Sequence, residues 1–353
     1  MNWLLVFIPI AVALEHLAPE RHLWIFAASG LAIVPLAGWM GRATEQIAER
    51  AGEGIGGFLN ATFGNAAELI IAIAALRAGL YDVVQASIVG SIVGNILLVL
   101  GAAMLAGGTK HKEQTYNAAG ARSQATMLTL AAIALIVPAA FRAATGGAGS
   151  AELGKLSVTV SIVLLAVYAL DLLFSLGTHR SLFAGSHEPE AGHAAAAWSY
   201  GKAAGVLAAA TVFIAWMSEI LVGAIEPAAQ GLGLNDAFVG VFVVAVLGNA
   251  AEHATAITAA MKNKMDLSLS IAVGSSVQVA LFVAPLLVLL SYTLGPTPMD
   301  LAFPGGLVLS ILLAVLITGQ VAGDGRSDWL KGLQLLAVYV VLGLAFFFLP
   351  NAG

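Results

Sequence analysis

Long apolar segments recur along the whole chain, and each is close to the length that a helix needs to cross a lipid bilayer. Such a helix takes about 20 mainly apolar residues, because the hydrocarbon layer is roughly 30 Å thick. Eleven segments of this kind lie at residues 2–17, 23–41, 56–79, 83–108, 120–142, 155–177, 203–226, 237–261, 267–293, 301–320 and 328–350. Since 59% of the residues are hydrophobic and only 10% are charged, a soluble domain is excluded. We predict an all-α integral membrane protein with eleven transmembrane helices.

The residue types that are missing narrow the chemistry. The chain contains no cysteine, which excludes disulfide bonds, thiolate zinc sites and cysteine nucleophiles. We expect the lipid bilayer as its surroundings, no nucleic-acid partner, no cofactor and no catalytic residue. The sequence leaves the oligomeric state open.

Lysine and arginine near the ends of the predicted helices are divided unevenly between the two sides of the membrane. Eleven fall on one side: Arg42, Arg50, Lys110, Lys112, Arg122, Arg180, Lys202, Lys262, Lys264, Arg326 and Lys331. Four fall on the other: Arg21, Arg77, Arg142 and Lys155. Because short cytoplasmic loops retain basic residues, we predict a cytoplasmic N-terminus and an outer C-terminus. In a prokaryote the membrane would be the cell (inner) membrane.

A polar motif occurs twice inside the apolar segments. The sequence Gly-Asn-Ala-Ala-Glu stands at 64–68 and again at 248–252, a spacing of 184 residues. At nearly the same spacing, Gly-Ser-Ile-Val-Gly-Asn at 90–95 is matched by Gly-Ser-Ser-Val-Gln at 274–278. The two copies begin five helices apart, so the second copy crosses the membrane in the opposite direction. This pattern predicts two inverted repeats of five helices, which in transporters face one another around a site near the bilayer midplane.

The repeat also predicts the organisation of the chain. It gives an extra N-terminal helix at 1–22, a first five-helix half at 23–177 with its motif at 60–70, a cytoplasmic linker at 178–200, and a second half at 201–353 with its motif at 248–257. The linker contains histidines and glutamates in a Gly/Ala-rich stretch. A solvated loop is the favoured interpretation, and a regulatory metal site is the alternative.

The glutamates of the motif are the main candidate site. Glu68 and Glu252 are each expected about midway through a membrane helix, and no lysine or arginine occurs within 56–76 or 237–261. A carboxylate in the bilayer is costly and usually marks an ion or proton path. It can take up a proton or bind a cation, so a facing pair can hold one divalent cation or two protons, but not both.

Neutral oxygen ligands accompany the glutamates. Calcium binds six to eight oxygens, and Asn65 and Asn249 each stand one turn before a glutamate on the same helix face. Supporting or gating residues are predicted at Thr62, Ser91, Asn95, Ser275, Gln278 and His253. For Asn95 and Gln278 the alternative is a hydrogen bond that only joins two helices. For His253 the choice lies between relaying a proton and bonding a neighbour.

Further acidic residues stand at the ends of two predicted helices. Glu45, Glu49 and Glu53 follow the second helix at the spacing of one helix face, and Glu219 and Glu226 end the seventh. They are predicted to draw cations toward the site by their negative charge. A solvated helix end explains them equally well.

The motifs also resemble those of a known family. The sequences Asn-Ala-Thr-Phe-Gly-Asn-Ala-Ala-Glu-Leu-Ile at 60–70, Gly-Asn-Ala-Ala-Glu-His at 248–253 and Gly-Ser-Ser-Val-Gln at 274–278 are similar to those of the calcium/proton antiporter family, within the cation/calcium exchanger superfamily. The resemblance covers essentially the whole chain and implies eleven helices, one extra helix plus two inverted halves. It further implies that Glu68 and Glu252 carry the cation and the protons.

We therefore expect a secondary transporter, not an enzyme, that exchanges Ca²⁺ for H⁺ by alternating access. The nearest alternative is a sodium/calcium exchanger of the same superfamily. Its members tend to place a hydroxyl residue and proline beside the acid, whereas alanines precede it here in both copies. More remote alternatives are a passive cation channel and an intramembrane hydrolase, although no Gly-x-Ser-x-Gly or His-Glu-x-x-His motif is present.

Overall fold

The computed structural model describes residues 2–51, 56, 59, 62–147, 149–179 and 198–349, and this part of the chain is helical almost throughout. The helices are η1 (Asn2–Val6), α1 (Phe7–Leu17), α2 (His22–Ala51), α4 (Ala66–Arg77), α5 (Tyr81–Val93), η2 (Gly94–Val99), α6 (Leu100–His111), α7 (Ala118–Thr145), α8 (Ser150–Leu173), η3 (Phe174–Thr178), α9 (Tyr200–Leu232), α10 (Asp236–Phe238), η5 (Val239–Val244), α11 (Ala245–Met261), α12 (Met265–Gln278), η6 (Val279–Val283), α13 (Ala284–Leu294), α14 (Gly305–Ala322) and α15 (Trp329–Phe347). The predicted all-α fold is confirmed, with helix at each of the eleven predicted positions. Two two-residue strands, β1 (Gln114–Thr115) and β2 (Arg326–Ser327), complete the described elements.

Nine helices in the described ranges are long and apolar enough to span a membrane, counting α5–η2–α6, α8–η3, η5–α11 and α12–η6–α13 as single continuous helices. The helix at residues 2–17 and α4 are shorter. Many large apolar side chains are exposed on the outer surface, among them Val163, Leu170 and Val341. A surface of this kind suits lipid, in which exposed aliphatic side chains carry no penalty.

Two helices differ in extent from the prediction. The segment predicted at 23–41 continues as a helix to Ala51. Its last turns carry exposed polar residues, which can lie outside the membrane and so did not count as part of the apolar segment. The length of the apolar segment therefore indicates how much of the helix fits in the membrane, but not where the helix ends. The segment predicted at 56–79 is interrupted by a turn at Gly64–Asn65, and α4 begins afresh at Ala66. Glu68 thus lies in the first turn of α4, where the helix dipole favours a negative charge.

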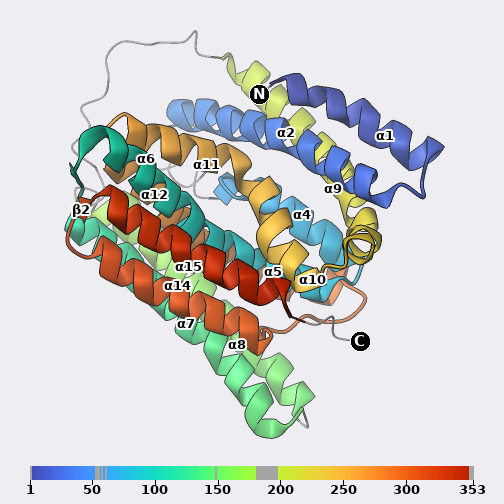
Figure 1. Cartoon of the computed structure of the whole chain (residues 1–353). Helices are drawn as coiled ribbons and strands as arrows, with labels where there is room; N and C mark the ends of the chain where they lie inside the picture. The colour runs from blue at the N-terminus through green and yellow to red at the C-terminus, as the bar shows by residue number, and fades with distance from the viewer. Residues whose placement is uncertain are drawn as a thin grey trace.

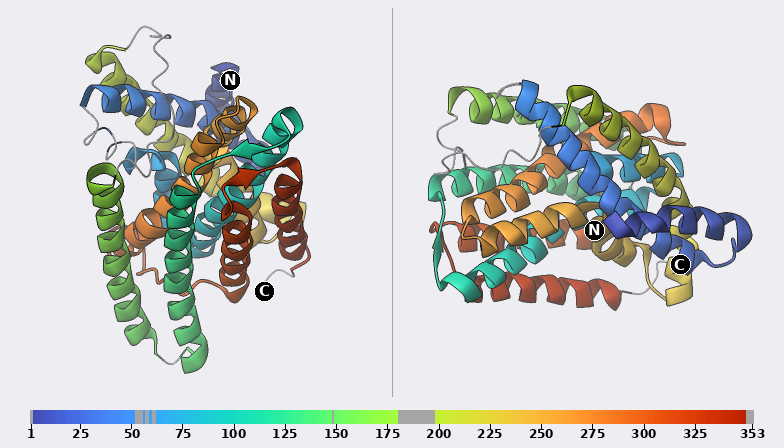
Figure 2. Two further views of the ribbon diagram at one scale, coloured as in Figure 1. Left: turned by 90° about the vertical axis from the view of Figure 1, so that its left-hand side faces the viewer. Right: turned by 90° about the horizontal axis from the view of Figure 1, so that it is seen from above.

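The helices form a bundle in which elements far apart in sequence lie side by side (Figures 1 and 2). The long helices α2 and α9, which occupy equivalent positions in the two halves, pack along one another, and α1 covers α2 from outside. On the other side of the bundle, α14 packs on α7, and α7 packs on α8. The N-terminal helix is therefore peripheral, as an addition to a two-part bundle should be.

Glycines let the central helices of the two halves approach closely. A Cβ atom placed on Gly90 of α5 would lie 2.4 Å from the Val241 carbonyl oxygen and 2.7 Å from Ala245 Cβ. A Cβ atom on Gly240 would lie 2.5 Å from Ala86 Cβ. Small residues are what allow membrane helices to gain packing energy at such crossings.

The strands join two loops at one end of the bundle. β1 pairs antiparallel with β2, so that Gln114 lies opposite Ser327. Nearby, Lys331 donates a hydrogen bond to Asp324 at 2.6 Å and thereby lowers the pKa of the Asp324 carboxyl group. No sequence pattern predicted these strands, because two residues carry no periodicity.

Candidate cation-binding site

The two copies of the motif meet through reciprocal hydrogen bonds. The Ser275 hydroxyl of α12 donates to Asn65 Oδ1, at 2.8 Å, and Asn249 Nδ2 of α11 donates to Ser91 Oγ of α5, at 3.1 Å. Asn65 and Asn249 are equivalent positions of the repeat, and so are Ser91 and Ser275. Each asparagine therefore bonds the serine of the other half, as expected of two inverted halves that face one another.

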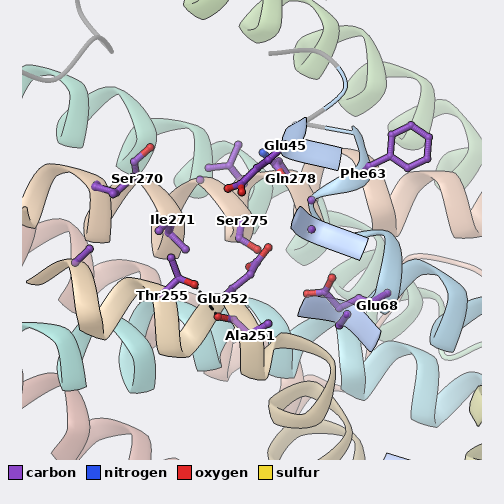
Figure 3. Close-up of a pocket in the computed structure, with 18 of the residues that line it drawn as sticks. Glu45, Phe63, Glu68, Ala251, Glu252, Thr255, Ser270, Ile271, Ser275 and Gln278 are labelled. Atoms are coloured by element: carbon purple, nitrogen blue, oxygen red, sulfur yellow. Dashed lines mark hydrogen bonds between the residues drawn. The ribbon is translucent and has the colours of Figure 1, made fainter. Parts of the chain in front are cut away.

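Glu68 and Glu252 line one cavity of about 980 Å³. Figure 3 shows Glu68 on α4 and Glu252 on α11 facing the same space, with Ser275 beside Glu252. A Cβ atom on Gly248 would lie 3.2 Å from Glu68 Cγ, so the glycine of the second motif makes room for the glutamate of the first.

Three buried oxygen atoms of this site have no hydrogen-bond partner within the described ranges. They are Glu68 Oε1, Glu252 Oε2 and Asn249 Oδ1. No ion pair of Glu68 or Glu252 with a basic side chain occurs in this part of the chain either. Buried polar atoms are normally satisfied, so a group of orphaned oxygens calls for an explanation such as a bound ion.

Four of the predicted supporting residues, His253, Asn95, Ser275 and Gln278, are joined with Asn65 in one chain of hydrogen bonds. His253 Nε2 donates to Asn95 Oδ1 at 3.2 Å, Asn95 Nδ2 donates to Ser275 Oγ at 3.2 Å, and the chain continues through Asn65 to Gln278 Oε1. Ser91 lies outside this chain and accepts a hydrogen bond from Asn249, and Thr62 precedes the turn at 64–65 and is not among the residues that line the cavity. The interhelical bonds that were the alternative interpretation of these side chains are present.

Each repeat also contains a π-helical segment at the end of its second polar motif or directly after it. η2 follows Ser91 and includes Asn95, and η6 begins right after Gln278. A π-helical turn widens the helix and is frequent at functional sites.

Among the described residues, the lining of the cavity reaches one end of the bundle. Its lining runs from the glutamates to Arg42, Glu45 and Lys262, all of which are at least partly exposed. On the opposite side, Glu68 borders a space of only about 20 Å³, lined mainly by apolar residues such as Ile88 and Val283. A space of this size holds one water molecule at most.

Equivalent faces of the two repeats also differ in how far their side chains are exposed. Val83 and Ala86 of α5 are 3% and 0% exposed. Their repeat equivalents on α12 are Leu267, which is 42% exposed, and Ser270, which is also exposed, and both line the cavity. The inverted halves are therefore packed unequally, closed on one side of the glutamates and open on the other.

The acidic residues at the helix ends are not all in one place. Glu45 lines the main cavity, whereas Glu49 accepts a hydrogen bond from Gln46 and does not line it. Glu219 and Glu226 line a separate pocket of about 500 Å³, where Arg77 lies 3.6 Å from Glu219. Glu53 and residues 180–197 of the linker lie outside the described residues.

Sequence reasoning missed Asp171 of α8, which lines the main cavity together with Tyr168. A signal was available, because Asp171 is the single charged residue between Lys155 and Arg180 in a strongly apolar segment. It was overlooked because it has no counterpart in the repeat. The described ranges contain no cluster of three or more His, Cys, Asp or Glu side chains that could hold a metal ion.

The one-sided opening can be tested by labelling, since the chain has no cysteine of its own. Thr255 of α11 is exposed in the cavity, and its repeat equivalent, Ile71 of α4, is 4% exposed. In the absence of Ca²⁺, Thr255→Cys should react with a membrane-impermeant maleimide added on the side of Lys262, and Ile71→Cys should stay unlabelled from either side. Equal labelling of the two cysteines would contradict the closed packing beyond Glu68.

Comparison with known proteins gives the family. The family model described as sodium/calcium exchanger protein matches residues 21–177 and 202–348. A protein of Aphanothece halophytica named Ca²⁺/H⁺ antiporter is 47% identical over 98% of this chain and 96% of its own. The Ca²⁺/H⁺ antiporter ChaA of Bacillus subtilis is 43% identical over 92% of both chains.

Solved structures agree with this assignment. The crystal structure of the selenium-substituted Ca²⁺/H⁺ antiporter protein YfkE superposes with a TM-score of 0.83 at 39% identity, over 99% of this chain and 100% of the other. Together with the apolar helices, these similarities make this chain a multi-pass membrane protein and a secondary transporter rather than an enzyme. The chain belongs to the sodium/calcium exchanger protein family.

Proposed function

We propose that this protein exchanges Ca²⁺ for H⁺ across a membrane and that Glu68 and Glu252 carry both substrates. The observation that carries the proposal is a pair of orphaned buried oxygens, Glu68 Oε1 and Glu252 Oε2, on two side chains that line one cavity, with a third orphaned oxygen, Asn249 Oδ1, in the same motif as Glu252. Oxygen atoms of carboxylate and amide groups are the ligands that Ca²⁺ prefers. Relatives named Ca²⁺/H⁺ antiporters, at 43–47% identity, support the same substrates.

Exchange follows from competition for the same two side chains. Two carboxylates in a desolvated site repel one another, and the site becomes neutral with one divalent cation or with two protons. A cation that leaves must therefore be replaced by protons before the site can move through the low-dielectric part of the protein. This coupling needs no energy source other than the two gradients.

The unequal packing of the repeats suggests how the site changes sides. In this state the cavity leads from Glu252 toward Lys262, the end that the distribution of basic residues predicts to be cytoplasmic. Alternating access would open the α5–η5 crossing at Gly90 and close the equivalent face of α12. We accordingly propose that this state faces the cytoplasm and receives Ca²⁺ there.

A sodium/calcium exchanger is the second candidate. The glutamate in each motif is preceded by two alanines rather than by a hydroxyl residue and proline, which leaves fewer neutral oxygens for sodium. The site therefore favours protons as the counter-ion. The relatives described above are named for protons as well.

Flux into proteoliposomes tests the proposal directly. Purified protein should accumulate ⁴⁵Ca²⁺ against its gradient when a pH gradient is imposed, and should move protons in the opposite direction when a Ca²⁺ gradient is imposed. A sodium gradient of the same size should drive little uptake. Calcium flux that is insensitive to the pH gradient would indicate a passive channel, and flux driven by sodium alone would favour the second candidate.

A further inference from the structure

The first asparagine of the repeat is held at both ends of its amide group. Asn65 Oδ1 accepts a hydrogen bond from the Ser275 hydroxyl at 2.8 Å, and Asn65 Nδ2 donates to Gln278 Oε1 at 3.0 Å. Ser275 is held in turn by Asn95, which His253 orients. The oxygen of Asn65 is thus occupied by a donor, and a cation would have to compete with that hydroxyl proton.

The second asparagine is held only at its nitrogen. Asn249 Nδ2 donates to Ser91 Oγ at 3.1 Å and to the carbonyl oxygen of Ala245 at 2.8 Å, which uses both of its N–H groups. Its oxygen is therefore fixed in direction, and it is buried without a partner among the described residues. Its neighbour in the chain, Gly248, packs against Glu68, since a Cβ atom there would lie 3.2 Å from Glu68 Cγ.

The difference lies in the direction of one hydrogen bond. In one half serine donates to asparagine, and in the other half asparagine donates to serine, although the residues are repeat equivalents. A serine hydroxyl can do either, because it is both a donor and an acceptor. The two serines also differ in their surroundings, since Ser275 lines the open cavity and Ser91 borders the small closed space beyond Glu68.

We propose that the two asparagines take turns as the neutral oxygen ligand of the cation. With the cavity open toward Lys262, Asn249 Oδ1 binds the cation while Ser275 caps Asn65 Oδ1. In the opposite state the roles exchange, so that Ser91 donates to Asn249 Oδ1 and Asn65 Oδ1 becomes free. Ser91 and Ser275 are then positioning residues that make the ligand set different on the two sides of the membrane. This inference rests on the proposed function.

Measurement of Ca²⁺ affinity on each side separately tests the proposal. Half-saturating Ca²⁺ concentrations can be measured for pH-driven exchange in everted and in right-side-out membrane vesicles. Ser275→Ala frees Asn65 Oδ1 and should lower the half-saturating concentration about tenfold, which corresponds to about 1.4 kcal/mol, on the side to which the cavity opens. Ser91→Ala should lower it on the other side only.

Two further variants separate positioning from simple packing. Ser276 is equally buried on α12 but bonds only backbone carbonyl oxygens, so Ser276→Ala should shift neither side. Ser275→Thr retains a hydroxyl donor and should restore the wild-type value on the cavity side. If Ser275→Ala and Ser91→Ala shift both sides equally, or weaken binding everywhere, the serines only support packing and the inference is wrong.

The asparagines give an independent check if a serine variant does not fold. Asn249→Ala should weaken Ca²⁺ binding on the cavity side, and Asn65→Ala should weaken it on the opposite side. Equal losses on both sides in both variants would overturn the exchange of roles while leaving Ca²⁺/H⁺ exchange intact. Absence of pH-driven Ca²⁺ flux in the wild-type protein would instead overturn the proposed function itself.

Discussion

Glu68→Gln and Glu252→Gln are each expected to abolish pH-driven Ca²⁺ exchange. Glutamine keeps the size of the side chain but can neither neutralise a divalent cation nor carry a proton out of the site. One remaining carboxylate leaves the bound cation with an uncompensated charge in a buried site, and breaking such a pair costs about 3–5 kcal/mol, which corresponds to at least a hundredfold loss. The measurement is ⁴⁵Ca²⁺ uptake into proteoliposomes under an imposed pH gradient.

A control separates the loss of the site from a general loss of charge. Glu152 lies in the first turn of α8, is exposed and does not line the cavity. Glu152→Gln should therefore transport at the wild-type rate. All variants should also elute as single peaks in size-exclusion chromatography. If either site variant transports near the wild-type rate, that glutamate does not belong to the mechanism.

Gly90→Ala is expected to disrupt the closed side of the protein. Its new Cβ would lie 2.4 Å from the carbonyl oxygen and 2.6 Å from Cα of Val241, so the backbones of α5 and η5 would have to separate. Overpacking costs about 1–3 kcal/mol even where side chains can adapt. Here the new Cβ atom would meet backbone atoms, which cannot move aside as a side chain can. We expect a lower apparent unfolding temperature in detergent and severely reduced exchange.

The repeat supplies the matched control for this substitution. Gly274 of α12 is the equivalent of Gly90, but it lines the cavity. A Cβ atom placed on Gly274 would have Gln124 Nε2, at 3.7 Å, as its nearest neighbour among the described residues. Gly274→Ala should leave the unfolding temperature close to that of the wild type. Equal destabilisation by the two substitutions would show that the repeats are packed alike, contrary to the structure.

The predicted helices were found because their signal is local. A run of about 20 apolar residues satisfies its own backbone hydrogen bonds only as a helix in lipid, so composition alone located all eleven positions. Helix ends were less accurate where no such constraint acts. α2 continues through polar, exposed turns to Ala51, and the Gly64–Asn65 turn interrupts a segment of uniform hydropathy.

The candidate site was predicted in part for a related reason. A duplicated polar pentapeptide is visible without any structure, and an inverted repeat requires its two copies to face one another. That reasoning located Glu68, Glu252 and their asparagines. It missed Asp171, which has no duplicate, and it could not separate Glu45, which lines the cavity, from Glu49, which does not.

The sequence by itself determined that this chain is a bundle of membrane helices with two inverted halves and a shared pair of acidic residues. These properties depend on the type and order of the residues, and the duplicated motif makes both visible in the sequence. The tertiary structure alone decided that the two halves are packed unequally. It also decided that the side-chain oxygen of Asn65 accepts a hydrogen bond, whereas that of Asn249 accepts none from the described residues. Equivalent sequences allow two directions for the same hydrogen bond, because a serine hydroxyl can donate or accept, so only the three-dimensional structure distinguishes the two halves.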